Sequence, residues 1–195
     1  MRVAQITRQT KETNIRLSLD LDGQGETELE TGIPFFDHML DAIGRHGLFD
    51  LSISAHGDLE VDAHHTVEDV GIVFGNAISE ALGDKRGITR FGSCLMPMDE
   101  ALVAAAVDIS GRGQLHWQVD LPIEFIGSFD TTLFKEFLIA LVSNAGVTLH
   151  VRSLAGENSH HIIEAAAKAV ARALSQAVAI DPRRAGSIPS TKGSI

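Results

Sequence analysis

The chain has 195 residues, of which 44% are hydrophobic and 22% charged, and its formal net charge is −10. This length can bury a core as one domain or as two small similar halves. The acidic balance argues against a nucleic-acid partner. We find no apolar run long enough to span a membrane and no secretory signal. Cys94 is the only cysteine, so no disulfide can form within the chain, and we expect a cytoplasmic protein.

The first half reads as two strands, a helix, one or two further strands and then a long helix. Apolar residues alternate with polar ones over residues 17–21 and again over 49–53, which predicts strands with one buried face. Between them, Pro34 favours the start of a helix that runs towards Arg45. A stripe of apolar residues at helical spacing over residues 67–81 predicts a second, longer helix.

The second half repeats this plan. "ETNIRLSLDLDG" (12–23) matches "EALVAAAVDISG" (100–111), a displacement of 100 − 12 = 88 residues. "PFFDHMLDAI" (34–43) matches "TLFKEFLIAL" (132–141), which sets His38 against Glu136. Apolar residues at helical spacing from 163 to 174 again predict a long final helix.

The repeat predicts an α+β fold, in which each half has a mainly antiparallel sheet covered by helices on one face. We expect the two halves to be related by a pseudo-twofold axis. They would form a single catalytic domain, with halves at about 1–92 and 93–180 and a C-terminal tail at 181–195.

Each predicted long helix begins with paired histidines. "DAHHTVED" (62–69) and "ENSHHIIEA" (157–165) share the pattern His-His-x-x-Glu, displaced by 160 − 64 = 96 residues. The second half must therefore carry about eight extra residues before its pair. Two copies of this pattern in matching surroundings favour metal ligands over ordinary surface histidines.

The spacing suggests how the ligands are shared. On a helix, His64 and Glu68 lie on one face, and adjacent side chains diverge by about 100°. His65 therefore points towards a different ion. We expect each metal to take the i, i+4 pair of one half and the diverging histidine of the other half. The matching residues of the second half are His160, His161 and Glu164, with His38 and Glu136 as candidates to complete the two shells. His150, on a predicted strand, is a ligand or a packed histidine.

Nitrogen and oxygen ligands without sulfur suit manganese, iron, cobalt, nickel or zinc. Open positions on such ions favour a catalytic role over a structural one. Glu12 and Glu100, at the starts of matching strands, are candidates for a general acid or base, or are exposed strand-end charges.

Anion-binding candidates lie elsewhere in the chain. Arg90 and Arg112 are basic residues beside predicted turns, and Ser190 and Lys192 in "PSTKG" offer a hydroxyl, a charge and flexible backbone amides for a phosphate. The composition of the tail predicts disorder. A tail that folds over a neighbouring subunit is the alternative.

Five stretches together resemble one enzyme family over essentially the whole chain: "GIPFFDHML", "DAHHTVEDVGI", "GSFDTTL", "AGENSHHIIEAAAKAVARAL" and "DPRRAGSIPSTKG". They are similar to the imidazoleglycerol-phosphate dehydratases of histidine biosynthesis, in the monofunctional form. The resemblance implies a ribosomal protein S5 domain 2-like fold. It also implies conversion of D-erythro-imidazole glycerol phosphate to imidazole acetol phosphate and water.

The resemblance further implies two manganese ions per active site and a homo-oligomer, typically of 24 subunits, with sites between subunits. Glu12 would contact the substrate and transfer a proton, and the phosphate would be held by Arg90, Arg112, Ser190 and Lys192. The implied metal ligands are His38, His64, His65, Glu68, His160, His161 and Glu164, together with Glu136, at whose position some relatives have histidine. A dinuclear metal phosphohydrolase and a metal-assembled structural protein are the competing hypotheses.

Overall fold

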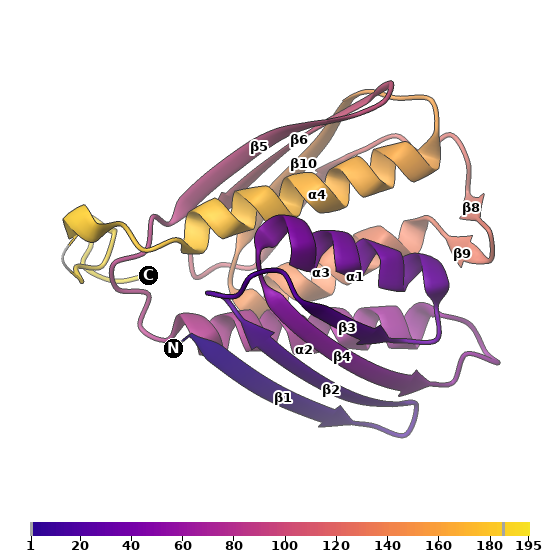
Figure 1. Cartoon of the computed structure of the whole chain (residues 1–195), viewed down its shortest axis with the longest axis horizontal. Helices are drawn as coiled ribbons and strands as arrows, with labels where there is room; N and C mark the ends of the chain where they lie inside the picture. The colour runs from indigo at the N-terminus through magenta and orange to yellow at the C-terminus, as the bar shows by residue number, and fades with distance from the viewer. Residues whose placement is uncertain (1, 185) are drawn as a thin grey trace.

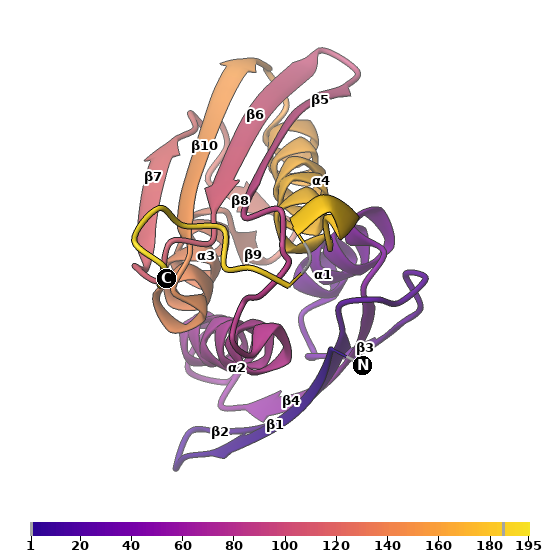
Figure 2. The same ribbon diagram turned by 90° about the vertical axis from the view of Figure 1, so that its left-hand side faces the viewer.

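The computed structural model describes residues 2–184 and 186–195. Two four-stranded sheets form the outer layers, and four helices fill the space between them (Figures 1 and 2). Each sheet is covered by helices on its inner face only. The predicted α+β class, with a mainly antiparallel sheet in each half and helices on one face, is therefore confirmed.

The first sheet has the strand order β1-β2-β4-β3. Its strands pair antiparallel, except that β3 runs parallel to β4. The elements of the first half are β1 (Val3–Gln9), β2 (Thr13–Asp20), β3 (Thr27–Glu30), α1 (Pro34–Gly47), β4 (Asp50–Gly57) and α2 (His64–Leu82).

The second sheet repeats this topology in the order β5-β6-β10-β7, and again only its last pair, β10 with β7, is parallel. A small hairpin of two strands, β8 and β9, precedes the third helix. The elements of this half are β5 (Phe91–Met98), β6 (Ala101–Asp108), β7 (Gln114–Gln118), β8 (Phe125–Ile126), β9 (Phe129–Asp130), α3 (Thr132–Ala145), β10 (Thr148–Ala155) and α4 (Ser159–Val178).

The structure shows where the two halves differ in length. The displacement is 88 residues from β2 to β6 and 98 from α1 to α3. Ten residues are therefore added between β6 and α3, the segment that contains the β8–β9 hairpin, and two are removed before the second histidine pair. The sequence also predicted two strands before the first helix of each half. It missed β3 and β7, because these edge strands are short and their buried faces are incomplete.

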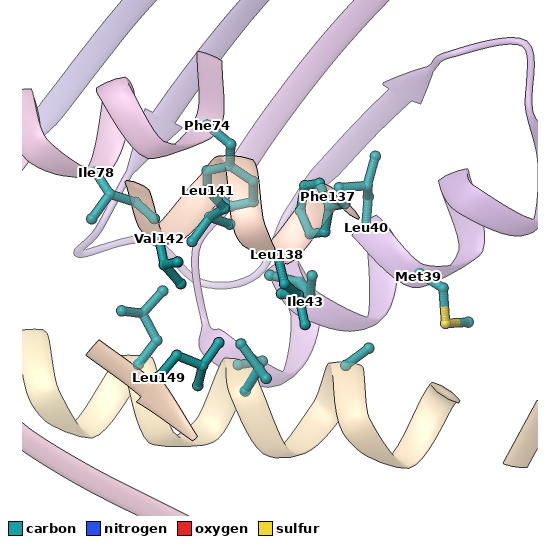
Figure 3. Close-up of a cluster of buried hydrophobic side chains, with 14 of the residues drawn as sticks. Met39, Leu40, Ile43, Phe74, Ile78, Phe137, Leu138, Leu141, Val142 and Leu149 are labelled. Atoms are coloured by element: carbon teal, nitrogen blue, oxygen red, sulfur yellow. The ribbon is translucent and has the colours of Figure 1, made fainter. Parts of the chain in front are cut away.

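The core lies between the helices of the two halves. α2 packs against α3, and α1 packs against α4, so each contact joins one half to the other. Figure 3 shows side chains from several elements meeting in this layer, among them Phe74, Phe137, Leu141 and Leu149. This shared core fixes α1 of one half beside α4 of the other, which positions the site described below.

The C-terminal tail follows the surface of its own chain in this structure. The backbone N–H of Gly87 donates to the carbonyl of Ser187, and Arg90 Nη1 donates to the carbonyl of Pro189 at 2.9 Å. The path of residues 186–195 thus differs from the predicted disorder, because Arg90 and Gly87 provide partners that composition does not reveal. No helix in residues 2–184 and 186–195 is long and apolar enough to cross a bilayer.

Candidate metal centre

One group of donor atoms brings the two halves together. His38 Nε2 lies 3.0 Å from Glu164 Oε2, and His160 Nε2 lies 3.1 Å from the same oxygen. One ligand atom from each of the three residues falls within 4.8 Å of the others. Two imidazole nitrogens and a carboxylate oxygen that converge in this way form a suitable site for a divalent transition metal.

Local structure accounts for this convergence. Asn158 caps α4 by accepting the backbone N–H of His160 at 2.9 Å, so the helix begins at Ser159, directly before the histidine pair. Glu164 follows one turn later on the same face. Pro34 lies in the first turn of α1, and His38 comes one turn further on. The packing of α1 on α4 then sets His38 opposite His160 and Glu164.

Glu164 is buried but remains ionised. Burial opposes its charge, yet the Lys168 ammonium at 2.7 Å and the bond to His38 outweigh burial and lower the pKa to about 2. Lys168 contacts Oε1, whereas the two histidines contact Oε2. Lys168 thus holds Oε1 in place while Oε2 faces the two histidines.

The matching residues of the first half are arranged more openly. His64 Nε2 lies 4.0 Å from Glu68 Oε2, and both side chains are about half exposed. Glu136 comes from α3, which packs on α2 as α1 packs on α4. Among the described residues, only His38, His160 and Glu164 form a group of three potential ligands. The predicted second group is therefore not assembled within one chain.

Within one chain, the diverging histidines lie apart from the i, i+4 pairs of the other half and contact carboxylates of their own half. His65 Nδ1 lies 3.0 Å from Asp58 Oδ2, and His161 Nδ1 lies 2.7 Å from Glu100 Oε2. These carboxylates raise the pKa of both histidines. Each histidine meets a carboxylate of its own half because adjacent helical side chains diverge, which turns His65 and His161 towards loops of their own halves.

Glu12 and Glu100 match in sequence but not in environment. His161 and the backbone N–H groups of Asn158 and Glu157 hold the Glu100 carboxylate and lower its pKa to about 2. The Glu12 side chain is 56% exposed, and its carboxylate lies 3.8 Å from His65 Nδ1. The Glu12 carboxylate is therefore exposed beside His65, whereas the Glu100 carboxylate is held by His161 and two backbone N–H groups.

The anion-binding candidates lie at the other end of the molecule. The Arg90 backbone N–H donates to the carbonyl of Ala177, near the C-terminus of α4, whereas His160 is at its N-terminus. Seventeen residues of helix separate these positions by about 25 Å. Figure 1 shows α4 running from the β8–β9 end to the end where the tail lies.

The four anion-binding candidates differ in exposure and in the partners that already occupy them. Asp108 pairs with Arg90 at 2.7 Å, while Arg112 is exposed and donates to the carbonyl of Ser110. Ser190 Oγ accepts the backbone N–H of Lys192 at 3.2 Å, and the Lys192 side chain is exposed. Lys192 and Arg112 are thus available to an anion, whereas Arg90 is partly neutralised.

His150 is separate from the metal group. It stacks on His116 of the neighbouring strand with ring centroids 4.1 Å apart, on the outer face of the second sheet. The packed alternative for this histidine agrees with the structure. The sequence reasoning also missed three partners of the candidate ligands: Asp58 beside His65, Asp99 with its Oδ2 3.7 Å from His161 Nε2, and Lys168 beside Glu164. Of these, only Lys168 had a local signal, because it lies four residues after Glu164.

Two copies of one α+β unit, each with a His-His-x-x-Glu helix start, define a class of internally duplicated enzymes. A family model described as imidazoleglycerol-phosphate dehydratase matches residues 31–174. Proteins of that name from Dinoroseobacter shibae and Acidiphilium cryptum are 60% and 62% identical to this chain, over 100% and 98% of both chains respectively. The chain belongs to the imidazoleglycerol-phosphate dehydratase family, whose members are lyases.

Two solved structures have the same fold. The crystal structure of imidazoleglycerol-phosphate dehydratase from Staphylococcus aureus superposes with a TM-score of 0.84 at 39% identity, covering 92% of this chain and 99% of that one. The Pyrococcus furiosus enzyme, in complex with (S)-C348, also gives 0.84, at 37% identity and 97% and 100% coverage. Both bear out the duplicated α+β architecture.

Proposed function

We propose that the protein is a manganese-dependent dehydratase that converts D-erythro-imidazole glycerol phosphate to imidazole acetol phosphate and water in histidine biosynthesis. Family membership supports the substrate and the reaction class. The observation that carries the metal dependence is the convergence of His38, His160 and Glu164. Their ligand atoms include an ionised carboxylate and no sulfur, which suits manganese among other divalent ions.

The residues named above have separate tasks in this reaction. His38, His160 and Glu164 would hold one metal, and His64 and Glu68 would contribute to a second. Ligands from neighbouring chains would complete the two shells: His65, His161 and Glu136. When bound, the metals would act as Lewis acids that stabilise negative charge on the imidazole ring. The reaction breaks one C–H and one C–O bond, water leaves, and the resulting enol becomes the ketone. Glu12, with its free carboxylate, would move a proton to or from carbon.

The separation of the two residue sets supports shared active sites. A single imidazole ring, a three-carbon chain and a phosphate cannot reach across the about 25 Å between the metal group and Arg90. The phosphate-binding end of one chain would therefore meet the metal end of another. This requirement supports the proposed homo-oligomer, for which we propose 24 subunits with active sites at subunit interfaces.

The first test is an assay of purified protein with imidazole glycerol phosphate, with manganese and then with a chelator. The ketone is measured by its absorbance in alkali, and inorganic phosphate is measured in parallel. We expect manganese-dependent ketone without phosphate release. Phosphate release without ketone would instead indicate a phosphohydrolase. If a metal-loaded assembly forms neither product, the metals have only a structural role.

Shared sites are tested by mixing two inactive variants, His160→Ala and Lys192→Ala. If sites combine the metal end of one chain with the tail of another, mixed oligomers contain some sites with both residues intact and regain part of the activity. The control is each variant taken alone through the same dissociation and reassembly. Mixed oligomers as inactive as the separate variants would refute sharing between chains.

A further inference from the structure

The two matching glutamates are held in place in different ways. In the second half, the Glu100 carboxylate itself anchors its turn. It accepts the backbone N–H groups of Asn158 at 2.9 Å and Glu157 at 3.2 Å, and it also contacts His161 Nδ1. In the first half, the carboxylate of Glu12 makes no hydrogen bond within the described residues. Something other than its own side chain must therefore hold the turn that carries Glu12.

Threonine hydroxyls hold this turn, which joins β1 to β2. Thr10 Oγ1 accepts the backbone N–H of Glu12 at 3.1 Å and that of Thr13 at 2.9 Å. The Glu12 carbonyl also accepts the backbone N–H of Asp58 at 3.1 Å. The backbone of Glu12 is thus fixed on both sides, and its carboxylate remains free.

The hydroxyls are in turn anchored to α2 by Asp69. Thr13 Oγ1 donates to Asp69 Oδ2, and Thr10 Oγ1 lies 3.1 Å from Thr13 Oγ1. Because a carboxylate only accepts, the Thr13 proton must point to Asp69, and the Thr10 proton then points to Thr13. Arg8 Nε donates to the other carboxylate oxygen of Asp69 at 3.0 Å. Asp69 and Thr13 are both buried, at 8% and 3% exposed, so neither can exchange these partners for water.

The duplication provides an internal comparison. At the displacements of the repeat, Ala101 matches Thr13 and Ala165 matches Asp69. The half that uses its glutamate carboxylate as an anchor therefore lacks the Asp69 network. The half that leaves its glutamate free contains the network instead. The network is thus associated with the free glutamate and not with the fold that both halves share.

We propose that Asp69 is a positioning residue for the dehydration: through Thr13 and Thr10 it sets the position of Glu12 relative to α2, which carries His64, His65 and Glu68. The inference rests on the proposed function, since it assigns a role in orienting the proton-transfer group. Asp69 itself would touch neither the substrate nor a metal. Its effect on catalysis would pass entirely through Glu12.

Asp69→Asn tests this chain of hydrogen bonds with little change in volume. The Asn amide nitrogen is a donor, so it must face either Arg8, another donor, or Thr13, whose hydroxyl then has to reverse. Either arrangement disturbs the turn. A second variant, Thr13→Val, removes the hydroxyl while it retains the β-branched shape that suits a strand. Asp50→Asn is the matched control. Asp50 also anchors a loop through backbone N–H groups, but it lies at the start of β4, whereas the Glu12 turn contacts Asp58 just after the end of β4.

We expect Asp69→Asn and Thr13→Val each to lower kcat by about 10- to 100-fold, with KM changed by less than about twofold, since a small misplacement of a reacting group is costly. Manganese bound per chain should stay at the wild-type value. Amide hydrogen exchange at Glu12 and Thr13 should become faster in Asp69→Asn. Asp50→Asn should alter neither kcat nor this exchange.

A double-mutant cycle with Glu12→Gln separates the outcomes. If Asp69 acts through Glu12, Asp69→Asn in the Glu12→Gln background should lower kcat by less than about twofold further. Equal fold-losses in both backgrounds, or loss of manganese in Asp69→Asn, would overturn the positioning role alone. Full turnover by Glu12→Gln would overturn the proposed role of Glu12 first, and the positioning role with it.

Discussion

The contact between α2 and α3 gives a sharp test of how the two halves are joined. α2 approaches α3 through Gly71 and Gly75, which lie one turn apart on one face. A Cβ atom added at Gly71 would lie 2.5 Å from the carbonyl oxygen of Phe137 and 2.8 Å from the Cβ of Ala140. We therefore predict that Gly71→Ala destabilises the protein, although alanine is the better helix former.

The magnitude follows from two opposing effects. Ordinary contact begins near 3.4 Å, so the helices would have to separate by about 1 Å. Overpacking of this kind costs about 1–3 kcal/mol, and alanine regains about 1 kcal/mol of helix propensity. Because the obstacle is a backbone carbonyl, which cannot rotate away, we expect a net loss of about 1–2 kcal/mol. For a chain of this length, Tm would fall by about 2–8 °C.

The assay is thermal and urea unfolding of wild type, Gly71→Ala and Glu80→Ala, each at two protein concentrations because assembly contributes to apparent stability. Glu80 is exposed on the same helix, so its replacement should change stability by no more than about 0.5 kcal/mol. A Gly71→Ala protein as stable as wild type, with Glu80→Ala also unchanged, would refute the close-packing explanation.

Three further predictions concern single groups. Backbone N–H groups of Glu26, Gln24 and Gly25 lower the pKa of Asp50 in the folded protein. The stabilisation from its carboxylate is therefore complete above the unfolded pKa, about 3.9, and is lost as the pH falls through the lower folded pKa. The difference in unfolding free energy between wild type and Asp50→Asn should shrink below about pH 4. Glu164→Gln should reduce bound manganese, measured by elemental analysis, and an unchanged content would exclude Glu164 as a ligand. Burial raises the pKa of the Cys94 thiol, so alkylation at neutral pH should be slower in the native protein than in urea, and equal rates would contradict this effect.

Much of the fold could be predicted from local sequence. Alternation of apolar residues identified β2 and β4, because each strand has one strongly buried face, and apolar residues at helical spacing identified α2 and α4. The repeat displacements of 88 and 96 residues placed the elements of one half on those of the other. β3 and β7 were not predicted, because an edge strand of four or five residues shows too little alternation of apolar and polar residues to be recognised.

The candidate ligands were likewise found by pattern, but their partners were not. The His-His-x-x-Glu spacing correctly set His160 beside Glu164, because an i, i+4 pair depends only on the helix. The contacts of His65 with Asp58 and of His161 with Glu100 depend on the paths of loops that no periodicity describes. The sequence therefore suggested shells shared between two halves without saying which chains supply them, and within one chain the structure has separate ion pairs.

The sequence by itself determined the family, the duplicated plan and the residue types available for metal and phosphate, since these are properties of motifs and their order. Only the tertiary structure decided which residues meet. It joined His38 to Glu164 across 126 residues through the packing of α1 on α4. It also placed Arg90 and the tail about 25 Å from the histidines, at the far end of α4. The physical reason is that helix and strand periodicities set the direction of each side chain, whereas close packing of the shared core sets the distances between elements.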